Sequence, residues 1–161
     1  MSKNKDTKTN VMRILDTYEI SYDSRTYTGK KPNSGLEVAQ AMGLNPESMF
    51  KTLVTETTDK RHFVFLVPVA SELDLKKAAK AVGEKKISML PAKELLPLTG
   101  YMHGGCSPIG MKKEFPTIID ETAILHETIS FSAGKVGVQI KIKLNDLSKV
   151  LDYKLADIQV S

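Results

Sequence analysis

The sequence predicts a single α+β domain in which helices surround a mixed β-sheet. Its 161 residues match the length of one domain, since domains cluster near ~100–150 residues. Hydrophobic residues make up 41% of the chain and charged residues 26%, as in a globular protein with its own core. Segments with strand character follow one another directly, and helical segments are interspersed without regular alternation. This order favours an α+β arrangement over a repeated β-α-β array.

Two amphipathic helices are expected near the start of the chain. Thr9 or Asn10 suits the N-cap of the first helix. Ser34 and Glu37 have the spacing of a capping box for the second helix, and Gly43 suits its end. The first helix has apolar residues at spacings i, i+3, i+4 and i+7, namely Val11, Ile14, Leu15 and Tyr18.

The middle and end of the chain alternate between strand and helix patterns. Lys51–Thr57 and His62–Val67 are expected to form a hairpin through the polar turn at residues 58–61. Asp74 suits the N-cap of a helix that ends at Gly83. Further strands are expected at Ser21–Tyr27, Lys86–Leu90, Thr117–Asp120, Thr128–Phe131 and Val136–Ile142, and further helices at Pro91–Leu98 and from Asn145 through Leu151.

Residues 1–9 are expected to form a loose polar tail, and residues 10–161 the folded domain. The net charge of +4 permits a polyanionic partner without requiring one. The tail lacks the apolar run of a signal peptide, and no stretch approaches the ~18 apolar residues of a membrane span. The single cysteine, Cys106, cannot form an internal disulfide, which suits the reducing cytoplasm. We therefore expect a cytoplasmic protein without a membrane segment.

The motifs of several common enzyme classes are absent from the sequence. There is no Gly-x-Ser-x-Gly elbow, no phosphate-binding loop ending in Gly-Lys-Ser/Thr, and no His-Glu-x-x-His. The three histidines, His62, His103 and His126, occur singly and without the spacing of metal ligands. We expect neither a bound metal nor a cofactor.

Two segments carry most of the candidate chemistry. Lys51 opens an apolar strand, where it is either merely solvated or a fixed cation that binds a phosphate or ribose. The loop Gly104-Gly105-Cys106-Ser107-Pro108-Ile109-Gly110 is either a structural turn or a shaped loop whose backbone N–H groups form an oxyanion hole. Cys106 also remains a possible nucleophile, with His103 close along the chain.

Two weaker segments flank this loop in the sequence. Lys112 and Lys113 either contact a nucleic-acid backbone or are simply solvated. Ser132-Ala133-Gly134-Lys135 lies between two expected strands, and taken alone it reads as a hairpin turn.

Together these segments resemble the YbaK/EbsC family of tRNA-editing proteins, also called the prolyl-tRNA synthetase associated domain superfamily. The resemblance covers roughly residues 10–158. It rests on short elements that occur in the family's order and spacing: Phe50-Lys51-Thr52-Leu53, Leu73-Asp74-Leu75-Lys76-Lys77, Thr99-Gly100-Tyr101, the loop Gly104–Gly110, Pro116-Thr117-Ile118-Ile119-Asp120 and Ser132-Ala133-Gly134-Lys135.

The resemblance implies a mixed, partly barrel-like sheet surrounded by helices. It also implies an enzyme that clears mischarged tRNA, typically Cys-tRNA(Pro), and that acts with prolyl-tRNA synthetase. Lys51 matches the family's functional lysine, while Gly104 and Pro108 match the ends of its Gly-x-x-x-Pro loop, which here encloses Gly105, Cys106 and Ser107. Tyr27 and Ser132 match pocket positions through their neighbouring residues.

One position departs from the family's pattern. Gln139 stands where some members have an aspartate. An amide accepts and donates hydrogen bonds, but it cannot supply a negative charge to a substrate ammonium group. The amino-acid preference is therefore less well defined by the resemblance than the fold.

The expected mechanism requires no strong nucleophile, because an aminoacyl ester is already activated. Either water or the substrate's own cysteine thiol attacks the ester carbonyl, and the loop backbone stabilises the oxyanion. Three alternatives remain: editing of another amino acid such as alanine on tRNA(Pro), a non-catalytic module that binds tRNA or a synthetase, and a metal hydrolase, which the lack of paired ligands makes the least favoured.

Overall fold

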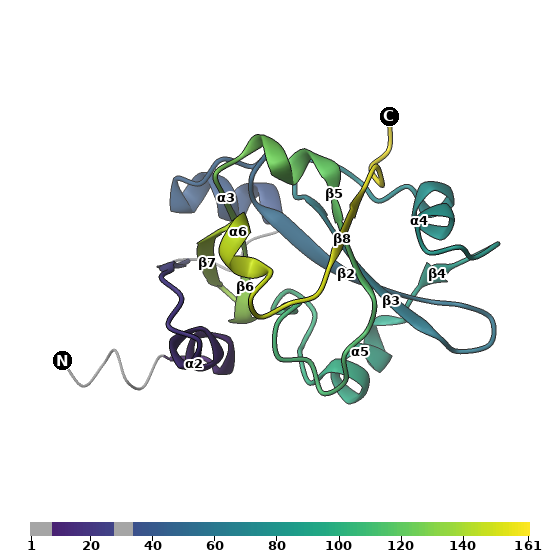
Figure 1. Cartoon of the computed structure of the whole chain (residues 1–161), viewed down its shortest axis with the longest axis horizontal. Helices are drawn as coiled ribbons and strands as arrows, with labels where there is room; N and C mark the ends of the chain where they lie inside the picture. The colour runs from purple at the N-terminus through teal and green to yellow at the C-terminus, as the bar shows by residue number, and fades with distance from the viewer. Residues whose placement is uncertain (1–7, 28–33) are drawn as a thin grey trace.

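The computed structural model describes residues 8–27 and 34–161, and it contains two β-sheets with helices around them (Figure 1). One sheet has three strands in the order β1-β7-β6, and the other has five in the order β4-β2-β3-β5-β8. The strands are β1 (Asp23–Thr26), β2 (Phe50–Glu56), β3 (His62–Pro68), β4 (Ser88–Met89), β5 (Thr117–Asp120), β6 (Thr128–Lys135), β7 (Val138–Lys143) and β8 (Lys154–Ala156). The helices are α2 (Asn10–Thr17), α3 (Gly35–Met42), α4 (Leu75–Ala81), α5 (Ala92–Thr99), α6 (Leu144–Leu147) and the 3-10 helix η1 (Glu121–Leu125). The predicted α+β class is confirmed.

Three helices begin at the residues that the sequence indicates. The Thr9 side chain accepts a hydrogen bond from the backbone of Met12, and Ser34 and Asp74 cap α3 and α4 in the same way. Most of the tail expected at residues 1–9 lies outside the described residues. Tyr18, which the spacing places on the apolar face of α2, is 57% exposed, because the helix ends one residue earlier.

The five-stranded sheet is mixed. β2 and β3 form the predicted antiparallel hairpin, in which Lys51 lies opposite Val67. β3 then pairs in parallel with β5, and β5 pairs in parallel with β8. Strand β3 is central and contributes fully buried residues to both sides of the sheet, including Phe65 and Leu66.

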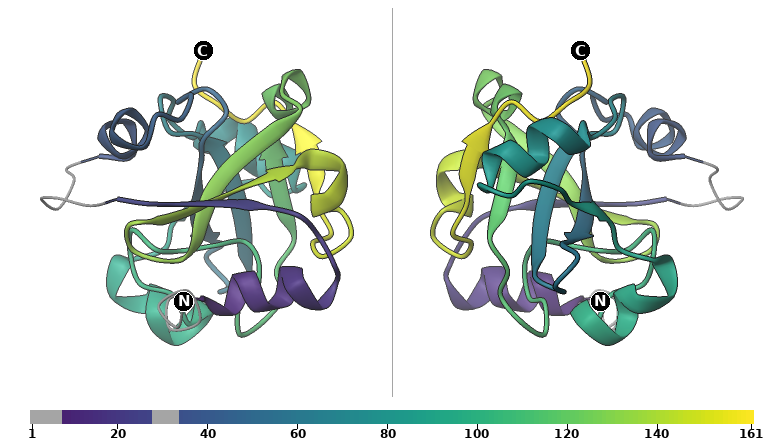
Figure 2. Two further views of the ribbon diagram at one scale, coloured as in Figure 1. Left: turned by 90° about the vertical axis from the view of Figure 1, so that its left-hand side faces the viewer. Right: turned by 90° about the vertical axis from the view of Figure 1, so that its right-hand side faces the viewer.

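The two sheets meet where β2 approaches β6. An isolated parallel bridge joins Met49 to Ser130, and the Ser130 N–H donates to the Ser48 carbonyl over 2.9 Å. The expected single sheet is therefore two sheets linked at one point, with a shared core between them that includes Phe50 and Phe131. In both views of Figure 2, α2 and α5 lie at one end of the molecule and α3 lies toward the other.

Several boundaries differ from the sequence-based expectations. The strand expected at Lys86–Leu90 is reduced to two residues, and the last helix to four. Neither η1 nor β8 was expected. Strand β8 is held by backbone pairing to β5, and its residues have no distinctive sequence pattern of their own. The segment expected to turn at Ser132–Lys135 instead continues β6 with an irregularity in its register, and the turn follows at residues 136–137.

The C-terminal segment is fastened by a buried carboxylate. Asp120 is fully buried and accepts hydrogen bonds from the Ile158 backbone N–H (3.0 Å), the Gln159 amide (2.7 Å) and the Thr122 backbone N–H (3.1 Å). Burial opposes ionisation of Asp120, but these hydrogen bonds outweigh it and hold the pKa of its carboxyl below the usual value. Within residues 8–27 and 34–161, no helix has the length and apolar character needed to cross a membrane.

Candidate functional site

Lys51 lies near the start of β2 and is partly buried. Its side chain is 30% exposed, and its Nζ lies 3.2 Å from Oε2 of Glu72, a residue whose own side chain is 81% exposed. The ammonium thus lies beside the sheet in a weak, solvent-exposed ion pair. An exposed carboxylate is its single ionic partner among the described residues.

The β6–β7 hairpin carries two of the predicted pocket residues. Ser132 on β6 lies opposite Gln139 on β7, and both are buried. Residues directly opposite each other in an antiparallel pair project to the same face, so these two side chains are neighbours. The Ser132 hydroxyl accepts from the Gly134 N–H over 3.1 Å, while Gln139 Oε1 is buried without a hydrogen bond from any described residue. Buried polar atoms without a partner are uncommon in folded proteins.

Tyr27 joins the same hairpin from β1. Its backbone N–H donates to the Gly137 carbonyl over 2.6 Å, which fixes the residue at the β6–β7 turn. Two residues earlier, on β1, Arg25 lies opposite Gln139 and donates to the Met42 carbonyl at the end of α3. The hairpin therefore gathers Tyr27, Ser132 and Gln139 within one small region.

The bridge between the sheets relates Lys51 to this hairpin. Lys51 lies two residues beyond Met49, and Ser132 lies two residues beyond Ser130, the two residues that the parallel bridge joins. The strands run in the same direction at the bridge, so Lys51 and Ser132 follow it by the same number of residues. Lys51 and Ser132 thus lie on the two strands that meet at this bridge, one in each sheet.

The glycine loop packs directly on the β6–β7 turn. A Cβ atom placed on Gly105 would lie 2.8 Å from the Val136 nitrogen and 3.1 Å from the Lys135 carbonyl carbon, so only glycine fits. Gly104 adopts a φ of +86°, a conformation that favours glycine. The Gly105 N–H donates to the Met102 carbonyl and is already used. Among the described residues, the N–H groups of Cys106 and Ser107 have no acceptor.

The side chains of the loop itself are buried. Cys106 is 8% exposed, and burial raises the pKa of its thiol to about 12. No described contact joins this thiol to His103, which is exposed. Ser107 is fully buried, and its hydroxyl accepts from the Ile109 N–H over 3.3 Å. These environments favour a supporting role for both side chains over a nucleophilic one.

The two lysines after the loop are placed differently from Lys51. Lys112 lies along Gly100, and its Nζ lies 3.4 Å from the Pro97 carbonyl at the end of α5. Lys113 is exposed. The structure thus places Tyr27, Gly104, Gly105, Ser132 and Gln139 at the β6–β7 hairpin. Lys51 lies on β2 beside Glu72, and the contacts of Lys112 point to α5.

Two residues near the site were not singled out from the sequence. Tyr101 donates its hydroxyl to the Ile109 carbonyl and packs where a Cβ on Gly134 would lie, so it fastens the glycine loop to β6. The short element Thr99-Gly100-Tyr101 was the available signal for it. Glu72 gave no signal, because an exposed acid in a loop has no distinguishing pattern.

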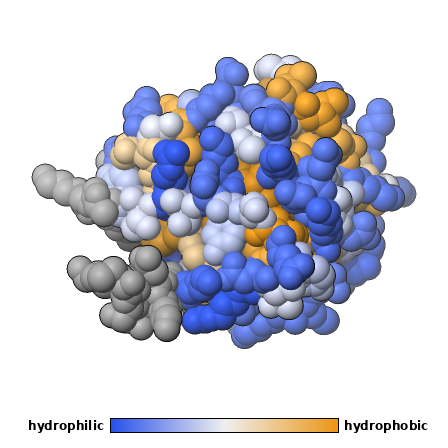
Figure 3. Space-filling view, turned by 60° about the vertical axis from the view of Figure 1, so that its left-hand side comes forward, coloured by the Kyte–Doolittle hydropathy of each residue, from blue (hydrophilic) through white to orange (hydrophobic). Residues whose placement is uncertain are grey.

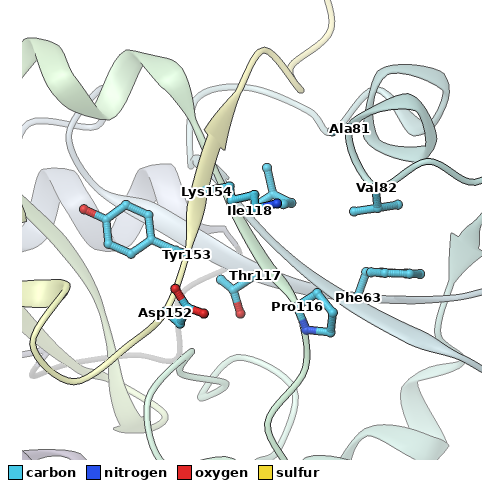
Figure 4. Close-up of a pocket in the computed structure, with 9 residues that line it drawn as sticks. All are labelled: Phe63, Ala81, Val82, Pro116, Thr117, Ile118, Asp152, Tyr153 and Lys154. Atoms are coloured by element: carbon cyan, nitrogen blue, oxygen red, sulfur yellow. The ribbon is translucent and has the colours of Figure 1, made fainter.

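Two cavities lie away from these residues. A cavity of about 430 Å³ opens between the end of α4 and strands β3, β5 and β8 (Figure 4), and its lining includes Phe63, Val82, Pro116 and Asp152. A second, of about 300 Å³, lies beside Glu56. Neither cavity is lined by a predicted site residue. Figure 3 shows a largely hydrophilic face with apolar side chains gathered mainly in a few patches.

Within residues 8–27 and 34–161, no group of three His, Cys, Asp or Glu side chains is placed to bind a metal.

Comparison with known proteins identifies the fold and the family. Over 152 residues the chain is 41% identical to a candidate Cys-tRNA(Pro)/Cys-tRNA(Cys) deacylase, EbsC, from Enterococcus faecalis, and the match covers 94% of this chain and 93% of the relative. A solved candidate trans-editing enzyme for prolyl-tRNA synthetase has the same fold, with a TM-score of 0.80, 22% identity, and coverage of 95% of this chain and 99% of that one. A solved hypothetical protein has a TM-score of 0.81 at 17% identity, over 94% of this chain and all of that one.

The family model of the aminoacyl-tRNA editing domain matches residues 34–150. This range contains Lys51, the glycine loop and the β6–β7 hairpin, while α2 and β1 precede it. The match covers well over half of the chain, and the relative from Enterococcus faecalis extends it to nearly the whole length. The chain therefore belongs to the aminoacyl-tRNA editing domain family.

Proposed function

We propose that the protein is a trans-acting deacylase that removes cysteine from Cys-tRNA(Pro), and also from Cys-tRNA(Cys), in the cytoplasm. The name of the EbsC relative supports this substrate class. The structural observation that supports it most is the packing of Gly105 on the β6–β7 turn, which leaves the N–H groups of Cys106 and Ser107 without acceptors among the described residues. The neighbour that edits for prolyl-tRNA synthetase suggests that enzyme as the partner.

The proposed chemistry depends on the loop backbone. When a nucleophile adds to the ester carbonyl, its oxygen becomes an oxyanion. The N–H groups of Cys106 and Ser107 stabilise that charge in a site from which protein packing excludes water. Losing one such donor typically costs about 10²–10³ in rate, or ~2.7–4 kcal/mol. Gly104 and Gly105 hold the loop in the shape that presents these donors.

The remaining residues hold the two ends of the substrate. Lys51 binds the phosphate or ribose at the tRNA terminus as a point charge. The Tyr27 and Ser132 hydroxyls contact the aminoacyl group, and Gln139 Oε1, buried without a described donor, accepts from its ammonium. Lys112 and Lys113 supply further positive charge near the tRNA backbone.

The nucleophile is either water or the thiol of the bound cysteine. Attack by the thiol forms a C–S bond as the C–O ester bond breaks, which yields a cyclic thioester and free tRNA. A tRNA(Pro) charged with α-aminobutyrate, which replaces the thiol with a methyl group, separates the two routes. Cleavage of this analogue at a rate near that of Cys-tRNA(Pro) requires water, and failure to cleave it requires the thiol.

A deacylation panel tests the proposal. The purified protein is mixed with Cys-tRNA(Pro), Cys-tRNA(Cys), Ala-tRNA(Pro) and Pro-tRNA(Pro), each with and without prolyl-tRNA synthetase. We expect rapid release of cysteine and slow release of proline. Preferential release of alanine would assign the site to another amino acid, and tRNA binding without deacylation would identify a non-catalytic module.

A further inference from the structure

The ammonium of Lys51 is already engaged by a carboxylate. Lys51 Nζ lies 3.2 Å from Glu72 Oε2, and within residues 8–27 and 34–161 it has no other hydrogen-bond acceptor. A phosphate that binds Lys51 must therefore compete with the Glu72 carboxylate for the same ammonium group. The two anions repel each other, and the ammonium is most favourable for phosphate when the carboxylate moves away.

The backbone around Glu72 is held in place by residues 158–160, which follow β8. The Val160 N–H donates to the Glu72 carbonyl over 2.9 Å, and the Asp74 N–H donates to the Ile158 carbonyl over 2.8 Å. Between these two bonds, Leu73 forms an antiparallel bridge with Gln159. The backbone of Glu72 is thus fixed, whereas its side chain is 81% exposed and can change its rotamer.

From this arrangement we propose that Glu72 is an electrostatic placeholder, a positioning residue that holds Lys51 in place in the free protein and yields it to the tRNA terminus. The inference rests on the proposed role of Lys51 in binding the tRNA terminus. Glu72 takes no part in ester cleavage. An ion pair with an exposed member is weak, so the carboxylate holds the lysine without preventing its transfer to phosphate.

Binding of tRNA at Lys51 must first break the ion pair with Glu72, and the free energy of that pair is subtracted from the tRNA affinity. Glu72→Gln keeps the shape and removes the charge. We expect its dissociation constant for tRNA to fall about two- to fivefold, the range given by exposed ion pairs. The single-turnover rate at saturating protein should remain unchanged, because Lys51 reaches the same bound state in both proteins.

A matched control separates this effect from net charge. Glu127 is exposed just before β6 and forms no ion pair with a described residue. Glu127→Gln makes the same change in net charge, and it should tighten tRNA binding less than Glu72→Gln does. In the Lys51→Ala background, Glu72→Gln should have no effect beyond that control.

The experiment measures binding of uncharged tRNA(Pro) to the full-length variants by fluorescence anisotropy at one low salt concentration, alongside single-turnover deacylation of Cys-tRNA(Pro). The inference is overturned if Glu72→Gln tightens binding no more than Glu127→Gln, if the effect persists without Lys51, or if the saturated rate falls. Wild-type protein that binds tRNA but releases no amino acid contradicts the proposed function instead. The binding comparison still decides the role of Glu72 in that case.

Discussion

Gly105 lies so close to Val136 that a Cβ atom on the glycine would stand 2.8 Å from the Val136 backbone nitrogen. Two backbone segments that are far apart in the sequence are thus in direct contact, with no side chain between them. The separation between the loop and the hairpin is set by the absence of one carbon atom.

Gly105→Ala should displace the loop from the hairpin and reduce deacylation of Cys-tRNA(Pro) by at least about 10²-fold, the scale of losing one oxyanion donor. Overpacking should cost about 1–3 kcal/mol of stability, which leaves the protein folded. Gly83→Ala is the control, because Gly83 ends α4 at a φ of +74° with nothing near its Cβ position. It should lose stability without losing the rate. Equal rates in both folded variants would contradict the proposed loop.

Lys51→Ala should cut deacylation by at least about 10²-fold while the thermal midpoint remains nearly unchanged. The pair with Glu72 contributes little to stability because that carboxylate is largely exposed. Lys51→Arg should also be poor, since a planar guanidinium does not replace a point charge in a tight site. Thermal melts and rates on the same preparations provide the comparison. An unchanged rate for folded Lys51→Ala would remove this residue from the site.

Cys106→Ser should retain deacylation within about one tenfold step, or ~1.4 kcal/mol. Because burial raises the pKa of the thiol to about 12, almost none of it is ionised between pH 6 and 9, and the wild-type rate should not follow its titration. A rate–pH profile of both proteins checks this. Complete loss of activity in a well-folded Cys106→Ser protein would instead support a cysteine nucleophile.

Asp120→Asn should destabilise the protein at pH 7 by roughly 2–3 kcal/mol, because an amide replaces a buried carboxylate that accepts several hydrogen bonds. The folded pKa of Asp120 is lowered, so its stabilising contribution is present above the unfolded pKa, near ~3.9, and is lost as pH falls through the folded value. The difference between wild type and variant should therefore shrink in acid. Urea unfolding at pH 7 and pH 3 measures it. Equal stabilities at pH 7 would show that the carboxylate charge is not needed.

The sequence indicated those elements that local chemistry determines. The caps at Ser34 and Asp74 and the β2–β3 hairpin depend on residues a few positions apart, and each was found where the pattern predicted it. Strand β8 and the pair between Lys51 and Glu72 depend on partners distant in the chain. A single sequence contains no local signal for such contacts.

The candidate site divides in the same way. The residue types Lys51, Gly104 and Gly105 drew attention because of their chemistry, and the resemblance added Tyr27 and Ser132. Which loop N–H groups remain free, however, is a matter of geometry. The Gly105 N–H is consumed by a local turn, whereas those of Cys106 and Ser107 are not, and this follows only from the folded backbone.

The bridge between the two sheets at Met49 and Ser130 affects how the protein loses activity. Lys51 belongs to one sheet and Ser132 to the other, and the bridge from Met49 to Ser130 is the backbone pairing between those two strands in the described chain. If the sheets tilt apart at that point, each keeps its own strand pairing while the proposed site separates into two halves. Inactivation then precedes global unfolding, as local opening does in many proteins. The exchange rate of the Ser130 amide proton reports when the two halves part.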